Sequence, residues 1–161
     1  RQENVDFSYP YFAAHQLILT QKNVHVKSVA DLKGKNVAVV ANSAGDIAAS
    51  KVFGKASKHI KRFDNTPLAL EELSAGGVDA AIGDVGVFAY YALQNPEKQF
   101  NMARDPSFED QYFGIAVRKG NTKVLNEINE GLKKVIASGA YAKVYAKWFG
   151  EKAPVPVLPI K

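Results

Sequence analysis

The clearest pattern of apolar and polar positions lies in residues 36–50, where a short β-branched run leads through small polar residues into an alanine-rich stretch. It predicts a strand, a tight turn at Asn42 and Ser43, and a helix over about 45–53. The first N–H groups of a helix lack helical partners and lie at the positive end of its dipole, so this turn can hold a carboxylate or phosphate. A simpler interpretation also stays open, in which Asn42 or Ser43 only caps the helix.

Short apolar runs alternate with stretches of helical periodicity over residues 36–102. This alternation predicts right-handed βαβ units and an α/β fold with an open, mainly parallel sheet. Further strands are predicted at 15–21, 60–63, 78–83, 100–103 and 111–118, and further helices from 66 to 75 and over 85–93.

The last third of the chain predicts two more helices. Apolar residues recur at helical spacing at Leu125, Ile128, Leu132 and Val135, and then at Tyr141, Val144, Tyr145 and Trp148. We interpret the second set as core and not as a ligand site. The proline-rich tail at 153–159 is expected to be extended on the surface or mobile.

Two polar features follow predicted strands of the sheet. Asn42 and Ser43 come after one strand, and Asp84 comes after another. Open α/β sheets bind ligands outside the carboxyl ends of their strands. A helix start suits an anion and a carboxylate suits a cation, so together they would suit a zwitterion. Asp84 has a simpler reading too, as the cap of the helix that follows it.

Composition excludes several classes of function. The 161 residues are 47% apolar and 23% charged, which is ordinary for a globular protein, and the net charge of +5 is scattered without a basic stripe for nucleic acid. The chain has no cysteine, and its three histidines lack ligand spacing, so we expect neither a metal site nor a cofactor. The N-terminus does not have the layout of a signal peptide, so any targeting segment is expected to be removed or to lie upstream.

Six ordered motifs carry a resemblance to a known family. They are residues 1–12 (RQENVDFSYPYF), 31–39 (DLKGKNVAV), 78–84 (VDAAIGD), 112–120 (YFGIAVRKG), 139–141 (GAY) and 147–150 (KWFG). In this order they resemble the extracytoplasmic solute-binding proteins of polar amino acid ABC transporters. The resemblance implies a periplasmic-binding-protein-like fold of two α/β lobes that close on an amino acid.

On that template the chain divides into three parts. Residues 1–15 would be the edge of lobe one and the first hinge, 16–109 a complete lobe two, and 110–161 the second hinge, the returning lobe-one helices and the tail. The chain resembles the later two thirds of a family member, and the first part of lobe one is expected to be absent from it.

The resemblance also implies roles for individual residues. Arg1 matches the arginine that clamps the ligand carboxylate, although a chain terminus normally frays. Ser43 matches the serine or threonine whose hydroxyl, with neighbouring N–H groups such as that of Ala44, holds the same carboxylate. Asp84 matches the carboxylate that binds the α-ammonium group. Asn42 departs from the pattern, because the family usually has glycine there.

The implied function is binding, not catalysis. The ligand would be a polar amino acid, which the protein would deliver to the membrane permease of an ABC transporter. The location would be periplasmic or extracytoplasmic, and membrane anchoring of the full-length form is left open. The alternatives are a fragment that self-associates by pairing or swapping its incomplete lobe one, a receptor sensor domain, and an enzyme similar to the dehydratases of prephenate or arogenate. An enzyme would need a positioned general acid in the cleft, and Asp84, the one carboxylate that we place there, already has a binding role.

Overall fold

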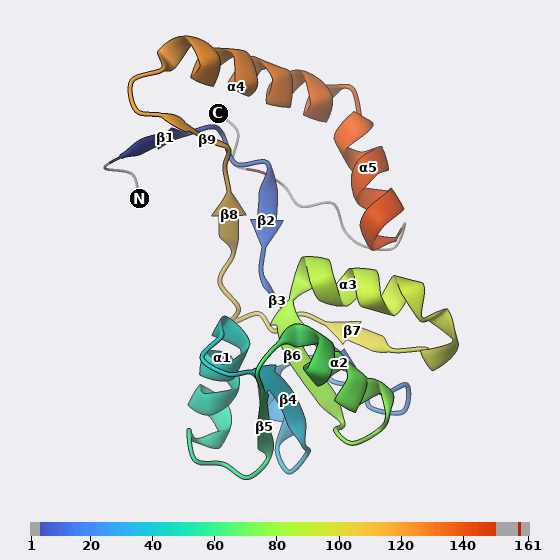
Figure 1. The fold of residues 1–161 in the computed structure, drawn as a ribbon. Helices are drawn as coiled ribbons and strands as arrows, with labels where there is room; N and C mark the ends of the chain where they lie inside the picture. The colour runs from blue at the N-terminus through green and yellow to red at the C-terminus, as the bar shows by residue number, and fades with distance from the viewer. Residues whose placement is uncertain (1–3, 151–157, 159–161) are drawn as a thin grey trace. The chain divides into compact units, whose positions relative to one another are not determined.

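The computed structural model describes residues 4–150 and residue 158 (Figure 1). Residues 15–109 form one compact unit, which we call the central unit, and the described residues of 1–14 and 110–161 form a second, the flanking unit. Within these described ranges, no helix has both the length and the apolar character needed to cross a membrane. Except for Leu158, the tail predicted to be extended lies outside the described residues.

The central unit is built on a five-stranded sheet with strand order β5-β4-β6-β3-β7. Its strands are β3 (Gln16–Thr20), β4 (Val37–Val40), β5 (Ile60–Phe63), β6 (Ala80–Asp84) and β7 (Asn101–Ala103). β4 is parallel to β5 and β6, whereas β3 is antiparallel to β6 and β7. All strands except β3 therefore run in one direction, which confirms the predicted α/β fold with a mainly parallel sheet.

Three α-helices lie between the strands of the central unit: α1 (Ala44–Phe53), α2 (Thr66–Ser74) and α3 (Val85–Gln94). Each starts at a polar cap, namely Ser43 for α1, Asn65 for α2 and Asp84 for α3. Two short 3-10 turns, η1 (Val29–Leu32) and η2 (Pro96–Lys98), complete the unit. Because a cap supplies an acceptor to an N–H group that the helix leaves open, these residues fix where each helix begins.

Apolar side chains cover both faces of the sheet. On one face, Ile18 and Ile82 belong to a buried cluster that includes Ala49 of α1. On the other, Phe88 of α3 packs over Gly83, where an added Cβ would lie 2.4 Å from its ring. Since neighbouring residues of a strand point to opposite faces, α1 and α3 lie on opposite sides of β6.

The flanking unit contains two short antiparallel pairs and two helices. β1 (Val5–Phe7) pairs with β9 (Ala116–Arg118), and β2 (Phe12–Ala14) pairs with β8 (Gln111–Phe113). The helices are α4 (Thr122–Ala137) and α5 (Ala140–Phe149). The single strand predicted at 111–118 is therefore wrong. β8 and β9 pair with different partners, and Gly114 between them packs against the backbone of Ser8.

The predicted core positions of α5 are correct only in part. Tyr145 is buried, and its ring makes tilted contacts with those of Phe12 and Phe149. The prediction is wrong for Val144 and Trp148, which are 57% and 49% exposed. Among the described residues of the flanking unit, the strands are limited to two short pairs. These pairs leave this apolar side of α5 uncovered.

Candidate functional site

The turn after β4 and the end of β6 lie at the same edge of the central sheet. β4 and β6 are parallel neighbours in which Val39 pairs with Ile82. Adjacent strands are about 4.8 Å apart, so the residues that follow them are close in space. The structure thus brings Asn42, Ser43 and Ala44 to one edge together with Asp84. Arg1, the remaining predicted site residue, lies outside the described part of the chain.

Ser43 caps α1 and leaves the first helical N–H groups open. Its extended backbone turns the chain into the helix, and its Oγ accepts a hydrogen bond of 3.2 Å from the N–H of Asp46. The N–H groups of Ala44 and Gly45 have no acceptor among the described residues. Helix α1 has ten residues, so its dipole adds positive potential at this end. The predicted capping is confirmed, and two donors are left for an anion.

Asn42 adopts the left-handed backbone conformation that the turn requires, with φ of 60°. Asparagine tolerates this conformation better than other residues with a side chain, and glycine tolerates it best. The glycine that the family resemblance implies here and the Asn42 found in this chain therefore satisfy the same backbone requirement. The substitution leaves the Ser43 cap intact.

Replacing Asn42 by glycine is expected to change stability little, whereas replacement by valine is expected to cost about 2 kcal/mol because a β-branched residue is strained at positive φ. Urea unfolding of the three proteins, followed by circular dichroism, measures the difference. Equal midpoints for the valine variant and the unmodified chain would contradict this account of the turn.

Asp46 holds the first turn of α1 in place through hydrogen bonds and an ion pair. Its side chain is mostly buried, and its carboxylate accepts hydrogen bonds from the N–H of Asn42 at 3.1 Å and from Ser50 Oγ at 3.0 Å. Arg62 of β5 donates from Nε at 3.0 and 3.1 Å. These bonds from Arg62, with those from Asn42 and Ser50, outweigh burial and lower the pKa of Asp46 below its usual value. Sequence analysis missed this role, although serine followed three residues later by an acid is a capping-box signal.

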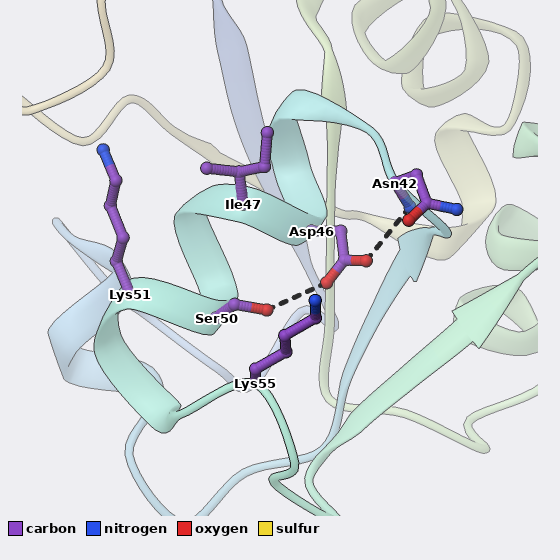
Figure 2. A pocket seen from close by; sticks show the side chains of 6 residues that line it. All are labelled: Asn42, Asp46, Ile47, Ser50, Lys51 and Lys55. Atoms are coloured by element: carbon purple, nitrogen blue, oxygen red, sulfur yellow. Dashed lines mark hydrogen bonds between the residues drawn. The ribbon is translucent and has the colours of Figure 1, made fainter.

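A hollow of about 380 Å³ lies along α1 next to this turn (Figure 2). It is lined by Asn42, Asp46, Ile47, Ser50, Lys51 and Lys55. Figure 2 shows the hydrogen bonds that hold the Asp46 carboxylate between Asn42 and Ser50. Because this carboxylate is also paired with Arg62, it is already neutralised and is not the group that would bind a ligand ammonium.

Asp84 ends β6 and caps α3. Its Oδ1 accepts hydrogen bonds from the N–H groups of Gly86 at 2.9 Å and Val87 at 3.4 Å. The capping interpretation is therefore confirmed. Within the described residues, Oδ2 has no hydrogen-bond donor, and the side chain is half-buried at the sheet edge. One carboxylate oxygen serves the fold while the second stays open to a cation.

Gln16 is a residue at this edge that sequence analysis missed. It is the first residue of β3 and pairs directly with Asp84 across the antiparallel ladder. A strand was predicted here, but its direction was not, and only the reversed direction of β3 brings its first residue to the carboxyl ends of β4 and β6. Among the described residues, no group of three or more His, Asp or Glu side chains is placed to hold a metal ion.

The family model for bacterial extracellular solute-binding proteins, family 3, matches residues 1–151. A probable histidine-binding protein of Neisseria gonorrhoeae is 41% identical over 94% of this chain and 57% of its own length. The arginine-, lysine-, histidine-binding protein ArtJ of Geobacillus stearothermophilus is 44% identical, with a TM-score of 0.65 over 96% of this chain and 66% of that one. An ancestral cationic amino acid solute-binding protein is 37% identical, with a TM-score of 0.81 over 92% and 64%.

The chain belongs to family 3 of the bacterial extracellular solute-binding proteins, the class that serves polar amino acid ABC transporters. The matched relatives are named as amino-acid-binding proteins and not as enzymes, and the family is periplasmic or extracellular. The chain spans just over half the length of the curated relatives it matches.

Proposed function

We propose that the protein binds a polar amino acid between two lobes and delivers it to the permease of an ABC transporter. The central unit would be lobe two, and the flanking unit would be the hinge segments and the returning part of lobe one. The observation that carries the proposal is the convergence, at one sheet edge, of the open N–H groups of Ala44 and Gly45 with the free oxygen of Asp84.

Each end of a zwitterion finds a complementary group at this edge. The α-carboxylate would accept from the N–H groups of Ala44 and Gly45 and from the Ser43 hydroxyl, with Arg1 as the clamp that the family resemblance implies. Asn42 would hold the turn that presents these donors. The α-ammonium would bind Asp84 Oδ2. The site thus recognises the part common to all amino acids and leaves the ligand side chain to other residues.

A basic amino acid is the first ligand class to test. The relative of Neisseria gonorrhoeae is named for histidine, ArtJ for arginine, lysine and histidine, and the ancestral protein for cationic amino acids. We propose histidine, arginine or lysine over glutamine, for which a Bacillus subtilis relative at 35% identity is named.

Thermal unfolding in the presence of each common amino acid tests the proposal. A ligand at 100 times its dissociation constant stabilises a protein by about 2.7 kcal/mol, which corresponds to a rise in Tm of several degrees. We expect the largest rise with a basic amino acid and none with its D-enantiomer. No rise with any amino acid at millimolar concentration, for a chain that unfolds cooperatively, would contradict binding by this chain.

We also propose that the chain alone self-associates through the flanking unit. The large apolar residues of α4 and α5 that are more than a third exposed are Val124, Val135, Val144 and Trp148. Exposed apolar patches of this kind favour association. A monomeric mass in solution at the concentration of the unfolding experiment would contradict this proposal.

A further inference from the structure

Gln16 shares one face of the sheet with Asp84. Residues paired directly across an antiparallel ladder have side chains on the same face, about 5 Å apart at Cβ. That face also carries Ile18 and Ile82, which pack with Ala49 of α1. The side chains of Gln16 and Asp84 therefore leave the sheet on its α1 face, at the edge where the Asp84 carboxylate also caps α3.

The carboxamide reaches the start of α1. A Cβ placed on Gly45 would lie 3.3 Å from Gln16 Oε1 and 2.6 Å from the backbone oxygen of Ile82. Glycine at this position lets the helix approach the sheet closely. Gln16 Oε1 thus lies beside Gly45, whose N–H is open, and the residue is the ladder partner of Asp84. Within the described chain its carboxamide makes no hydrogen bond, although the residue is half-buried.

The chemistry of an ammonium group explains what this oxygen can do. An ammonium has three N–H donors. Asp84 Oδ1 already accepts from Gly86 and Val87, which leaves Oδ2 as the acceptor of that carboxylate. One oxygen cannot satisfy three donors in a closed site, and a buried donor without an acceptor weakens binding. Gln16 Oε1 is a neutral acceptor on the same face.

We propose that Gln16 contacts the ligand, and that its Oε1 accepts a hydrogen bond from the α-ammonium group beside Asp84. The inference rests on the proposed function, because it needs an amino acid at this edge. It adds a ligand contact from β3. Three elements, β3, β6 and α1, would then hold the part of the ligand that is common to all amino acids.

Three variants separate the possible roles of Gln16. Gln16→Met removes the acceptor and is expected to weaken binding of L-arginine or L-histidine about tenfold. Gln16→Glu keeps an acceptor and adds negative charge, so it should bind at least as tightly as the unmodified chain. Gln94→Met makes the same change at an exposed position of α3 and should have no effect. If Gln16→Met does not fold, Gln16→Ala removes the same acceptor.

Titration of the ¹⁵N-labelled 161-residue chain with L-arginine and L-histidine measures these affinities, and the amide signal of Gly45 reports the site. The same spectra show whether each variant is folded. Unchanged affinity of Gln16→Met would overturn the inference and leave the proposed function standing. Equal weakening by Gln16→Glu would overturn the acceptor role, since it would indicate donation from Nε2 to the ligand carboxylate or a structural role. Absence of binding by the unmodified chain would overturn both proposals.

Discussion

Asp84→Asn is expected to weaken amino acid binding about hundredfold while leaving the fold intact. Losing one partner of a desolvated charge pair costs about 3 kcal/mol, and the α-ammonium would lose its anionic partner. Asparagine is as good a helix cap as aspartate, so the hydrogen bonds to Gly86 and Val87 can persist through its amide oxygen. Isothermal titration with the amino acid that stabilises the chain most gives the change in Kd.

The control for this prediction is Asp64→Asn, which makes the same chemical change at an exposed position just before the Asn65 cap. It should leave both Kd and Tm unchanged. If Asp84→Asn binds as tightly as the unmodified chain, then Asp84 is only the cap of α3. If its Tm falls sharply, the asparagine does not replace the cap, and a change in Kd would then not isolate the charge.

Local sequence signals were enough to predict most of the central unit. Serine at 43, asparagine at 65 and aspartate at 84 each precede a stretch of helical periodicity, and each is a cap in the structure. These capping signals involve residues only three or four positions apart, so they can be recognised directly in the sequence. Because strands alternate with helices, the sheet edge that holds Ser43 and Asp84 could be predicted as well.

Contacts between distant residues could not be predicted in the same way. Arg62 reaches Asp46 across 16 positions, and Asp105 accepts from the N–H of Val29 across 76. The direction of β3 depends on its two neighbours and not on its own residues, which is why Gln16 was missed. In the flanking unit, periodicity identified the apolar faces of α4 and α5, but not whether another element covers them.

The family resemblance supplied the expected ligand-binding roles, which neither the periodicity nor the capping signals of the sequence indicate. A cap and a ligand-binding group use the same residue types, and the geometry shows that the two roles are compatible. Asp84 gives one oxygen to α3 and keeps the other, while Ser43 caps α1 and leaves two N–H groups open. The ligand-binding roles of Arg1, Asn42, Ser43, Ala44 and Asp84 stay predictions.

Asp46→Asn is expected to lower the free energy of unfolding by about 2 kcal/mol at pH 7, between the scales for exposed and buried ion pairs, because Asp46 is buried and Arg62 is partly exposed. Arg62 would lose its ionic partner and keep its hydrogen bonds to Ser50 and to the Lys55 carbonyl, and the N–H of Asn42 would lose a charged acceptor. Since the pKa of Asp46 is lowered in the folded state, its contribution is fully present above the unfolded-state value near 4. It is lost as the pH falls through the folded-state pKa. Urea unfolding at pH 7 and at pH 3 measures both effects.

The difference between the unmodified chain and Asp46→Asn should therefore shrink on acidification below about pH 4, the ordinary range of a carboxyl pKa. A double-mutant cycle with Arg62→Gln separates the ion pair from the bonds to Asn42 and Ser50, since the pair energy is the part that the two changes share. A difference that stays constant from pH 7 to pH 3 would contradict the account, because an asparagine and a carboxyl group protonated at low pH are both neutral. If the effects of the two substitutions on the free energy of unfolding are strictly additive, the stabilisation comes from the cap of α1 alone. In that case Arg62→Gln should leave the backbone of Asn42 and the open N–H groups of Ala44 and Gly45 in place.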